Sequence, residues 1–224
     1  MVKGAVPSRE DYFRVLAACL PEETLVVTCL GNASYLWARL RDRPENFYVE
    51  DSMGLALPLA LGLAVAQPRR KVVGVEGDGG LLMHLGALVT VGAVAPRNLT
   101  VLLIQNGVHA ASGGQALTNP HLDLADLARS AGLRRADTVR SPEDFRGALL
   151  STFRDDGPAL LALITAPDPE VVEPPAPLNP VVVKQRFMDA LGAPCYVPST
   201  FGKGRFVEVG SPETTSGTRR PGHS

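Results

Sequence analysis

KVVGVEGDGG (residues 71–80) and NLTVLLIQNG (residues 98–107) are the two stretches of sequence that decide the fold. Each contains an aliphatic run of strand length and ends in a turn that contains glycine. The run Leu99 to Ile104 is aliphatic enough for a strand that is buried on both faces, which is typical of a parallel sheet. Residues 81–94 between the two stretches are apolar and long enough for a helix. This order predicts two parallel strands joined by a helix.

The same alternation extends in both directions along the chain. A helix is predicted from Ser8 to Pro21, because Ser8 is suited to cap its start and Pro21 to end it. The other predicted helices cover residues 33–41, 54–66, 122–131 and 142–153, and the other predicted strands cover 24–30, 136–139 and 159–164. Repeated strand and helix segments predict an α/β fold, a doubly wound parallel sheet with helices on both faces.

Three segments of the chain differ in composition. Residues 1–166 carry the alternating pattern, so we expect them to form one domain. Residues 167–192 begin with closely spaced prolines and end in a short amphipathic pattern, which predicts an extended Pro-rich strap followed by a helix at 182–191. Residues 193–224 are rich in Gly, Pro, Ser and Thr, and we expect a disordered tail there.

Bulk properties argue against several function classes. The net charge is -1 and Lys and Arg are scattered, so no basic surface for nucleic acid is indicated. The most apolar stretch, residues 54–66, is shorter than the roughly 20 residues that a membrane-spanning helix needs. The three cysteines lack metal-ligand spacing and suggest neither a disulfide framework nor a zinc site. We therefore expect a cytoplasmic protein that binds neither nucleic acid nor membranes.

Polar residues follow both of the deciding strands. Gly77-Asp78-Gly79-Gly80 follows the first strand, and Gln105-Asn106-Gly107 follows the second. Ligands of an open parallel sheet bind at the carboxyl ends of its strands, so both turns can face one ligand. Asp78 and Asn106 offer the hard oxygen atoms that Mg²⁺ prefers. The N–H groups of Gly79 and Gly80, at the start of a helix, are suited to phosphate groups. Together these residue types indicate a metal-bridged diphosphate.

Two other interpretations of these turns remain. Gly and Asp are common in turns for conformational reasons alone. A nicotinamide dinucleotide site also uses a glycine-rich turn after a strand, but the Gly-x-Gly-x-x-Gly spacing is absent. Asp78 would also repel a pyrophosphate unless a cation lies between them. The nicotinamide and metal-bridged interpretations differ in their need for a metal, because a nicotinamide oxidoreductase would bind NADH without one.

The spacing of the two turns resembles that of the thiamine diphosphate enzymes. Their motif is Gly-Asp-Gly followed, after a spacer, by Asn-Asn or a close variant. Here 25 residues, Gly80 to Ile104, separate Gly77-Asp78-Gly79 from Gln105-Asn106, and Gln105 replaces the first Asn. The resemblance implies that thiamine diphosphate is the cofactor. It also implies that Asp78, Asn106 and the backbone carbonyl of Val108 hold Mg²⁺.

Longer stretches carry a closer resemblance. RDRPENFYVEDSMGLALPLALGLAVAQP (41–68), GDGGLLMHLGALVTVGAVAPRNL (77–99) and QNGVHAASGGQ (105–115) are similar to the C-terminal half of phosphonopyruvate decarboxylases and the β-subunit of sulfopyruvate decarboxylases. The resemblance covers about Thr24 to Leu191 and implies decarboxylation of a 2-oxo acid to an aldehyde and CO2. A carboligase of the acyloin or acetolactate type would share the cofactor chemistry. A noncatalytic cofactor-binding subunit would share the fold.

The resemblance implies further cofactor contacts on two other turns, namely Gly31, Asn32, Ser34, Asp51, Ser52 and Met53. Met53 corresponds to an apolar side chain that lies under the cofactor and brings its two rings together, although a core-filling methionine is the alternative. The backbone carbonyl of Asp51 is placed to accept a hydrogen bond from the pyrimidine amine. Asn32 and Ser34 are suited to donate to the diphosphate, or else to form an Asx turn and a helix cap.

His109 closely follows Gln105-Asn106-Gly107, here called the metal turn, in a loop that we expect to continue over the cofactor. Its imidazole can titrate near neutral pH, so we expect it to be catalytic, assisting proton transfer or holding an acidic substrate. Relatives often read HDSTGGQ, whereas this chain has Ala110 and Ala111 in place of Asp and Ser. The difference leaves the identity of the 2-oxo acid open.

Activation of thiamine diphosphate needs a glutamate that the family places in a separate pyrimidine-binding domain. The sequence contains no second α/β pattern that would supply it, and Glu50 and Glu76 belong to the diphosphate-binding half. We therefore expect a separate pyrimidine-binding subunit, an active site at the interface between the two chains, and an α2β2 assembly.

Overall fold

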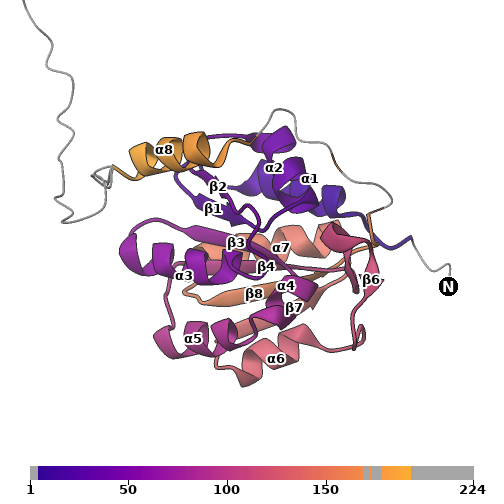
Figure 1. The fold of residues 1–224 in the computed structure, drawn as a ribbon. Helices are drawn as coiled ribbons and strands as arrows, with labels where there is room; N and C mark the ends of the chain where they lie inside the picture. The colour runs from indigo at the N-terminus through magenta and orange to yellow at the C-terminus, as the bar shows by residue number, and fades with distance from the viewer. Residues whose placement is uncertain (1–4, 169–171, 173–177, 193–224) are drawn as a thin grey trace, which may run out of the picture.

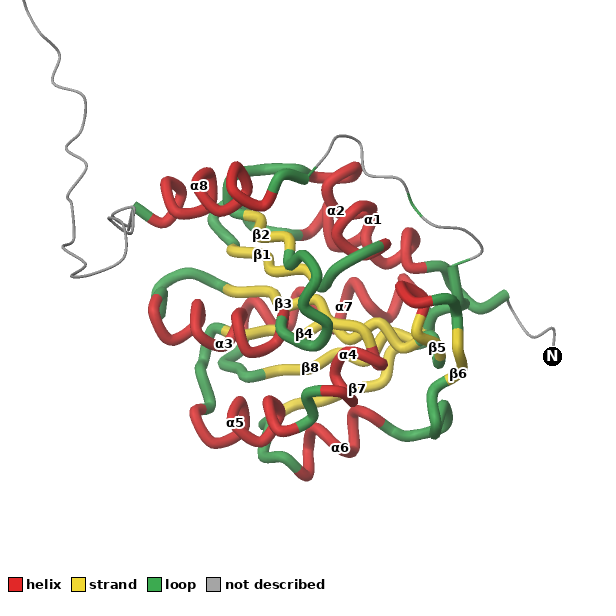
Figure 2. The backbone as a smooth tube through the Cα atoms, viewed as in Figure 1, coloured by secondary structure: helices red, strands yellow, loops and turns green. Residues whose placement is uncertain are grey.

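The sheet at the centre of the molecule has six parallel strands. The computed structural model describes residues 5–168, 172 and 178–192. The strands of the sheet are β1 (Leu25–Thr28), β2 (Asn46–Tyr48), β3 (Val72–Gly77), β4 (Leu99–Gln105), β7 (Arg135–Val139) and β8 (Ala159–Ile164). Their order is β2-β1-β3-β4-β8-β7, and every neighbouring pair is parallel (Figures 1 and 2). The predicted doubly wound α/β fold is confirmed.

Helices cover both faces of the sheet (Figure 1). One face is covered by α1 (Arg9–Cys19), α2 (Asn32–Arg41) and α7 (Pro142–Arg154), and the other by α3 (Ala56–Ala66), α4 (Asp78–Met83), α5 (Gly86–Val94) and α6 (Leu124–Ser130). The last helix, α8 (Pro180–Leu191), packs beside the edge strand β2. Alternate side chains of β4 enter the two cores, because Val101 and Leu103 lie in one and Leu102 and Ile104 in the other. The central strands are therefore buried on both faces.

Three segments differ from the sequence prediction. Residues 81–94 form two helices rather than one, because His84 N–H donates to the Leu81 carbonyl and this short-range bond turns the chain before α5. The sequence does not predict β2, since three residues at a sheet edge are too few for a recognisable run. Pro180 belongs to the predicted strap but begins α8, because proline fits the first turn of a helix and Asn179 caps it.

Part of the predicted strap and all of the predicted tail lie outside the described residues. These are residues 169–171 and 173–177 of the Pro-rich strap, and the tail predicted at 193–224. Within the described part of the chain, no helix combines the length and the apolar character that a membrane crossing requires.

The register of the central strands brings the ends of β1, β3 and β4 to one level. Thr28 pairs with Val75 across β1 and β3, and Gly77 pairs with Ile104 across β3 and β4. The chain leaves β1 toward the edge strand β2 and then returns to β3 on the other side of β1. Ligands bind in the crevice that opens where the strand order reverses in this way. The two turns expected to face one ligand therefore follow neighbouring strands.

Candidate functional site

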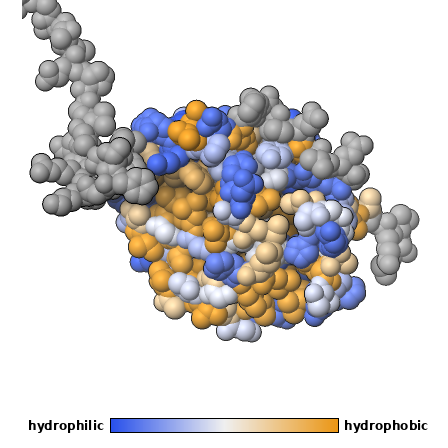
Figure 3. All heavy atoms as spheres, in the orientation of Figure 1, coloured by the Kyte–Doolittle hydropathy of each residue, from blue (hydrophilic) through white to orange (hydrophobic). Residues whose placement is uncertain are grey.

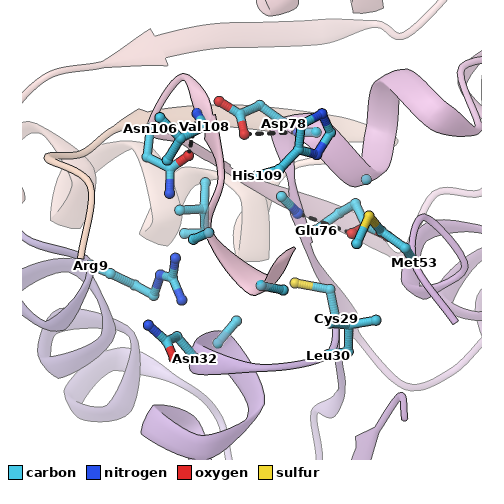
Figure 4. A pocket seen from close by; sticks show the side chains of 17 residues that line it. Arg9, Cys29, Leu30, Asn32, Met53, Glu76, Asp78, Asn106, Val108 and His109 are labelled. Atoms are coloured by element: carbon cyan, nitrogen blue, oxygen red, sulfur yellow. Dashed lines mark hydrogen bonds between the residues drawn. The ribbon is translucent and has the colours of Figure 1, made fainter. Parts of the chain in front are cut away.

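A pocket lies at the carboxyl ends of β1, β3 and β4 (Figure 4). Its walls come from the turn after β1, the turn after β3, the loop after β4 and the turn before α3, and Arg9 reaches it from α1. The predicted site residues that line it are Asn32, Met53, Gly77, Asp78, Gly79, Gly80, Asn106, Val108 and His109. The fold thus brings most of the predicted contacts to one cavity.

Asp78 is a buried carboxylate in the pocket wall, with 2% of its surface exposed. Its Oδ1 accepts a hydrogen bond from Gly79 N at 2.8 Å, and its Oδ2 accepts one from Gly107 N at 2.7 Å. Burial raises the pKa of Asp78 above its usual range, and these backbone N–H groups oppose the rise. Among the described residues, Asp78 has no salt-bridge partner. A cation at this position would stabilise the ionised form.

Asn106 provides a neutral oxygen at the end of the neighbouring strand. Its Oδ1 accepts a hydrogen bond from Val108 N at 3.1 Å, and both residues line the pocket with Asp78. No three His, Cys, Asp or Glu side chains of the described chain are grouped as a metal site. A metal ion at this turn would therefore depend on amide, backbone, phosphate and water oxygens, the ligands that Mg²⁺ commonly takes.

Glu76 is a second buried carboxylate in the pocket wall, with 1% of its surface exposed. Its Oε2 accepts a hydrogen bond from Ala56 N at 3.1 Å, and its Oε1 accepts one from Gly77 N at 3.0 Å. Burial raises the pKa of Glu76, and it raises the pKa of the neighbouring Cys29 thiol to about 12. The bond to Ala56 ties β3 to the start of α3, just after the turn that carries Met53. Glu76 therefore helps to hold the Met53 turn in place.

Gly79 and Gly80 are closely surrounded by side chains, and the phosphate contacts predicted for their N–H groups stay a prediction. A Cβ atom on Gly79 would lie 2.5 Å from His109 Nδ1, and a Cβ atom on Gly80 would lie 2.5 Å from Glu76 Oε1. The side chains of His109 and Glu76 thus fill the space that the missing Cβ atoms leave. Only Gly77, of the three glycines of this turn, has no atom within 4 Å of an added Cβ.

Ser34 and Asn32 make contacts that differ from those expected. Ser34 is fully buried outside the pocket wall, and its hydroxyl donates to the Cys29 carbonyl at 2.8 Å, so it is not placed to donate to a diphosphate. Asn32 lines the pocket, but its Nδ2 donates to Asp168 Oδ2 at 3.0 Å and its Oδ1 accepts from Val172 N at 3.0 Å. Neither residue caps α2, because the N-cap position is Gly31.

Gly31, Asp51 and Ser52 lie beside the pocket rather than in its wall. Gly31 faces the loop after β4, since a Cβ atom on it would lie 3.6 Å from Ala111 Cβ. Asp51 has a φ of 52°, a left-handed conformation that is uncommon for a non-glycine residue, in the turn that carries Met53. Ser52 lines a separate surface groove. The expected hydrogen bond to the Asp51 carbonyl stays a prediction.

The loop after β4 is a small hairpin that the sequence does not predict. β5 (Val108–His109) pairs with the antiparallel β6 (Gln115–Ala116), and a short 3₁₀ turn lies between them. Gln115 Nε2 donates to the Ser112 carbonyl at 3.0 Å within the hairpin. Residues 111–116 are exposed, whereas His109 lines the pocket. The hairpin therefore presents one side to the pocket and the other to solvent.

Arg9 is a pocket residue that the sequence prediction lacks. It is the first residue of α1, it is 6% exposed, and its Nη2 lies 2.8 Å from Asp168 Oδ2 in a salt bridge. Arginine at the start of an amphipathic helix is usually exposed, so residue type alone suggests a surface position. Its spacing of three and four residues from Tyr12 and Phe13 is the signal that places it on the buried face.

A family model matches this part of the chain. The model of the C-terminal TPP binding domain of thiamine pyrophosphate enzymes covers residues 28–163, which include the strand ends and turns of the pocket. The chain belongs to the thiamine pyrophosphate enzymes. The expected resemblance to this family is confirmed, and with it the expected thiamine diphosphate-binding fold.

Two relatives of this thiamine pyrophosphate enzyme are decarboxylases. A phosphonopyruvate decarboxylase from Streptomyces viridochromogenes is 40% identical over 73% of this chain and 41% of its own length. The β subunit of a sulfopyruvate decarboxylase from Methanocaldococcus jannaschii is 32% identical over 83% of this chain and 97% of its own length. The chain thus spans less than half of the first relative and nearly all of the second.

A solved structure has the same fold as this thiamine pyrophosphate enzyme. It is the thiamine diphosphate-dependent 4-hydroxybenzoylformate decarboxylase from Rhodococcus jostii, which superposes with a TM-score of 0.63 at 23% identity. The superposition covers 76% of this chain and 34% of that protein. At this identity the similarity supports the fold alone.

Proposed function

We propose that this chain is the diphosphate-binding, β-type subunit of a two-subunit thiamine diphosphate-dependent 2-oxo-acid decarboxylase. In this proposal residues 1–166 form the cofactor-binding domain. The substrate is phosphonopyruvate, sulfopyruvate or a related 2-oxo acid, which is converted to an aldehyde and CO2. The decarboxylase relatives support this substrate class. The near-complete coverage of a sulfopyruvate decarboxylase β subunit supports the two-subunit arrangement.

The observation that carries the proposal is the buried Asp78 carboxylate, which has no salt bridge among the described residues and lies beside Asn106 at adjacent strand ends. A carboxylate in this state favours a cation, and the Asn106 amide and Val108 carbonyl can complete a set of hard oxygen ligands. The first turn of α2, which also borders the pocket, has no side-chain cap, so its N–H groups suit an anionic group. These residues fit Mg²⁺ and a diphosphate, and Asp78, Asn106 and Val108 would hold the metal.

Thiamine diphosphate, when bound, supplies the nucleophile and the electron sink for decarboxylation. Met53 offers it an apolar contact on a turn that Glu76 helps to fix. Burial raises the pKa of the Cys29 thiol, so this side chain adds a neutral group to the pocket wall. The His109 ring packs with Nδ1 against Gly79, which leaves Nε2 as the atom that can hold or deliver a proton.

An exposed apolar surface supports the presence of a partner subunit. The α3–α5 face consists of large hydrophobic side chains that are more than a third exposed: Leu55, Leu59, Val65, Met83, Leu85, Val89 and Val94. Figure 3 shows hydrophobic surface gathered where α3 and α5 lie. α3 contains no polar side chain, so it is apolar on its exposed side as well as its buried side. Such surfaces mark protein contacts, and we assign this one to the pyrimidine-binding subunit.

Calorimetry tests the cofactor site. The chain, together with the product of the adjacent reading frame, is titrated with thiamine diphosphate and Mg²⁺. We expect binding, and a loss of roughly 100-fold in affinity for Asp78→Ala, because the metal loses its charged ligand. Asp156→Ala is the control, since Asp156 is an exposed carboxylate that pairs with Arg97 away from the pocket. Wild-type protein that does not bind, or Asp78→Ala protein that binds equally well, would contradict the proposal.

Product analysis tests the reaction. The same pair of chains is incubated with phosphonopyruvate, sulfopyruvate and pyruvate, and CO2 and aldehyde are measured. We expect CO2 and aldehyde in equal amounts from one of these acids. An acyloin or acetolactate product would instead identify a carboligase. Cofactor binding without CO2 release from any 2-oxo acid would indicate a noncatalytic subunit.

Copurification tests the partner surface. We expect the double variant Val65→Asp/Val89→Asp to lose copurification with the pyrimidine-binding subunit, because two charges would be buried in an apolar contact. Both side chains are more than half exposed, so the chain itself should still fold. Leu150→Asp, an exposed site on α7 at the other face of the sheet, is the control. If the double variant copurifies with the partner as well as Leu150→Asp does, the contact lies elsewhere.

A further inference from the structure

We infer that Arg9 is an anion-binding side chain of this pocket, which binds a phosphate-type oxyanion across the cavity from the metal turn. The inference rests on the proposed function and adds a residue and a ligand chemistry to it. The oxyanion is either the diphosphate of the cofactor or the phosphonate or sulfonate group of a substrate. Both are tetrahedral groups that a guanidinium can bind through paired N–H donors.

The start of α1 directs Arg9 into the pocket. Ser8 caps the helix, because its Oγ accepts from Asp11 N at 3.2 Å while its own N–H donates to Asp11 Oδ2 at 2.8 Å. Arg9 is then the first helical residue, on the same side as the buried Tyr12 and Phe13. Figure 4 shows its guanidinium pointing into the cavity from the side opposite Met53.

The guanidinium of Arg9 is only partly paired within the described chain. Its Nη2 makes the salt bridge with Asp168, while its Nε is buried and has no hydrogen-bond partner. Nη1 has no hydrogen bond to a described residue either. Arginine carries five N–H donors, so an oxyanion in the cavity can accept from guanidinium donors that no described residue takes up.

The charges around the pocket favour an anion beside Arg9. Among the described residues of the wall, Arg9 is the one permanently cationic side chain, against the carboxylates of Glu76 and Asp78. A diphosphate next to Asp78 adds negative charge that a single Mg²⁺ does not neutralise fully. The uncapped first turn of α2 borders the same cavity through Asn32 and Ala33 and adds N–H donors. Arg9 supplies the remaining positive charge at the end away from the metal turn.

Asp168 positions Arg9 from behind. Its side chain is 14% exposed, lies outside the pocket wall, and also accepts a hydrogen bond from Asn32 Nδ2 at 3.0 Å. The chain before it runs beside the segment that leads into α1, since Ala166 N donates to the Pro7 carbonyl at 2.9 Å. A carboxylate from the strap thus orients an arginine of the first helix toward the cavity.

Calorimetry with inorganic pyrophosphate and Mg²⁺ on the full chain tests for an oxyanion site without thiamine. We expect Arg9→Met to weaken binding by at least about tenfold, and Arg9→Lys by less, because lysine keeps the charge but loses the paired donors. Asp168→Asn should reproduce part of the loss, since Arg9 stays charged but is no longer oriented. Arg14→Met is the matched control, on the same helix with an exposed side chain paired to Glu10. Circular dichroism checks that each variant is folded.

Titrations with thiamine diphosphate and thiamine, and KM values for the 2-oxo acids, then distinguish the two sources of the oxyanion. A loss for thiamine diphosphate with none for thiamine assigns Arg9 to the cofactor. A raised KM for phosphonopyruvate or sulfopyruvate but not for pyruvate, at unchanged cofactor affinity, assigns it to the substrate. Folded Arg9→Met protein with wild-type values in every one of these measurements overturns the inference. Wild-type protein that binds pyrophosphate but not thiamine diphosphate contradicts the proposed function and leaves the inference about Arg9 standing.

Discussion

The turn after β3 and the hairpin after β4 meet at one pocket, but they are built differently. In the β3 turn, Glu76 and Asp78 are buried, and each carboxylate accepts hydrogen bonds from two backbone N–H groups. In the hairpin, residues 111–116 are exposed, and the side-chain bonds of Ser112 and Gln115 stay within the hairpin. The core of the fold therefore fixes one wall of the pocket, while the other wall can change without disturbing the core.

Gly80→Ala breaks the rigid turn and should have the largest effect. The new Cβ would lie 2.5 Å from Glu76 Oε1 and 3.2 Å from Gly54 N, and a shift of either disturbs β3 or the Met53 turn. Alanine regains about 1 kcal/mol of helix propensity, so we expect a net loss of about 2 kcal/mol in the free energy of unfolding, measured in urea. Gly86→Ala is the control, because nothing lies within 4 Å of its added Cβ. Equal stability of the two variants would show that the turn is not tightly packed.

Gly79→Ala acts where the turn and the hairpin touch, and a smaller loss is expected. Its Cβ would lie 2.5 Å from His109 Nδ1 and 3.3 Å from Leu117 Cδ2, but these are side chains that can move. We expect a loss of about 1 kcal/mol, and recovery of most of it in Gly79→Ala/His109→Ala, which removes the obstructing ring. Gly77→Ala, with open space around it, should be neutral. A double variant no more stable than Gly79→Ala would mean that His109 is not the obstacle.

Glu76→Gln tests the buried carboxylate of the β3 turn through the pH dependence of thermal stability. Burial raises the pKa of Glu76 above its ordinary value of 4.5. When the pKa of a carboxyl is higher in the folded state than in the unfolded state, the free energy of unfolding of the protein falls as the pH rises from the unfolded pKa to the folded one. Melting temperatures of the cofactor-free chain should therefore fall, relative to Glu76→Gln, as the pH increases above 4.5. Glu143→Gln, at an exposed site, should give a curve parallel to wild type. A parallel curve for Glu76→Gln would refute the expectation.

Ala110→Asp changes only the hairpin wall and should have the smallest effect on the fold. Ala110 lines the pocket but lies in a partly exposed turn, so we expect the free energy of unfolding to change by less than about 0.5 kcal/mol. Cofactor affinity should stay the same, while KM values for the 2-oxo acids should shift several-fold relative to one another. Ser112→Ala, in the same hairpin but outside the pocket wall, is the control. A large loss of cofactor affinity in Ala110→Asp would show that the two walls are coupled.

The fold could be predicted from the sequence because buried parallel strands appear in it as long aliphatic runs. β8 has the predicted bounds, and β4 extends the predicted run by one residue. β2 and the hairpin escaped prediction, since strands of two or three residues leave no periodic pattern. The bend at His84 also escaped, because residues 81–94 are apolar throughout and only the hydrogen bonds show where the helix stops.

Part of the site could also be predicted from the strand pattern. Asp78 and Asn106 follow neighbouring strands, so the strand pattern alone brings them together. The contacts of Arg9, Asn32 and Ser34 depend on tertiary structure. The spacing of Arg9 from Tyr12 and Phe13 indicates a buried position, but nothing in the local sequence indicates its contact with Asp168. The packing of His109 against Gly79 also depends on tertiary structure, because a glycine beside a phosphate and a glycine beside an imidazole look alike in sequence.

The contact between the first helix and the strap has a consequence for the synthesis of the protein. Asn32 and Asp168 are 136 residues apart, and Arg9 is still further from Asp168. Because the N-terminal part of a chain leaves the ribosome first, α1 and the β3 turn exist long before the residue that orients Arg9. Pairings over such distances also form slowly. The pocket can therefore reach its final form only after β8 and the start of the strap have been translated, so a nascent chain stalled before that point lacks a complete binding site.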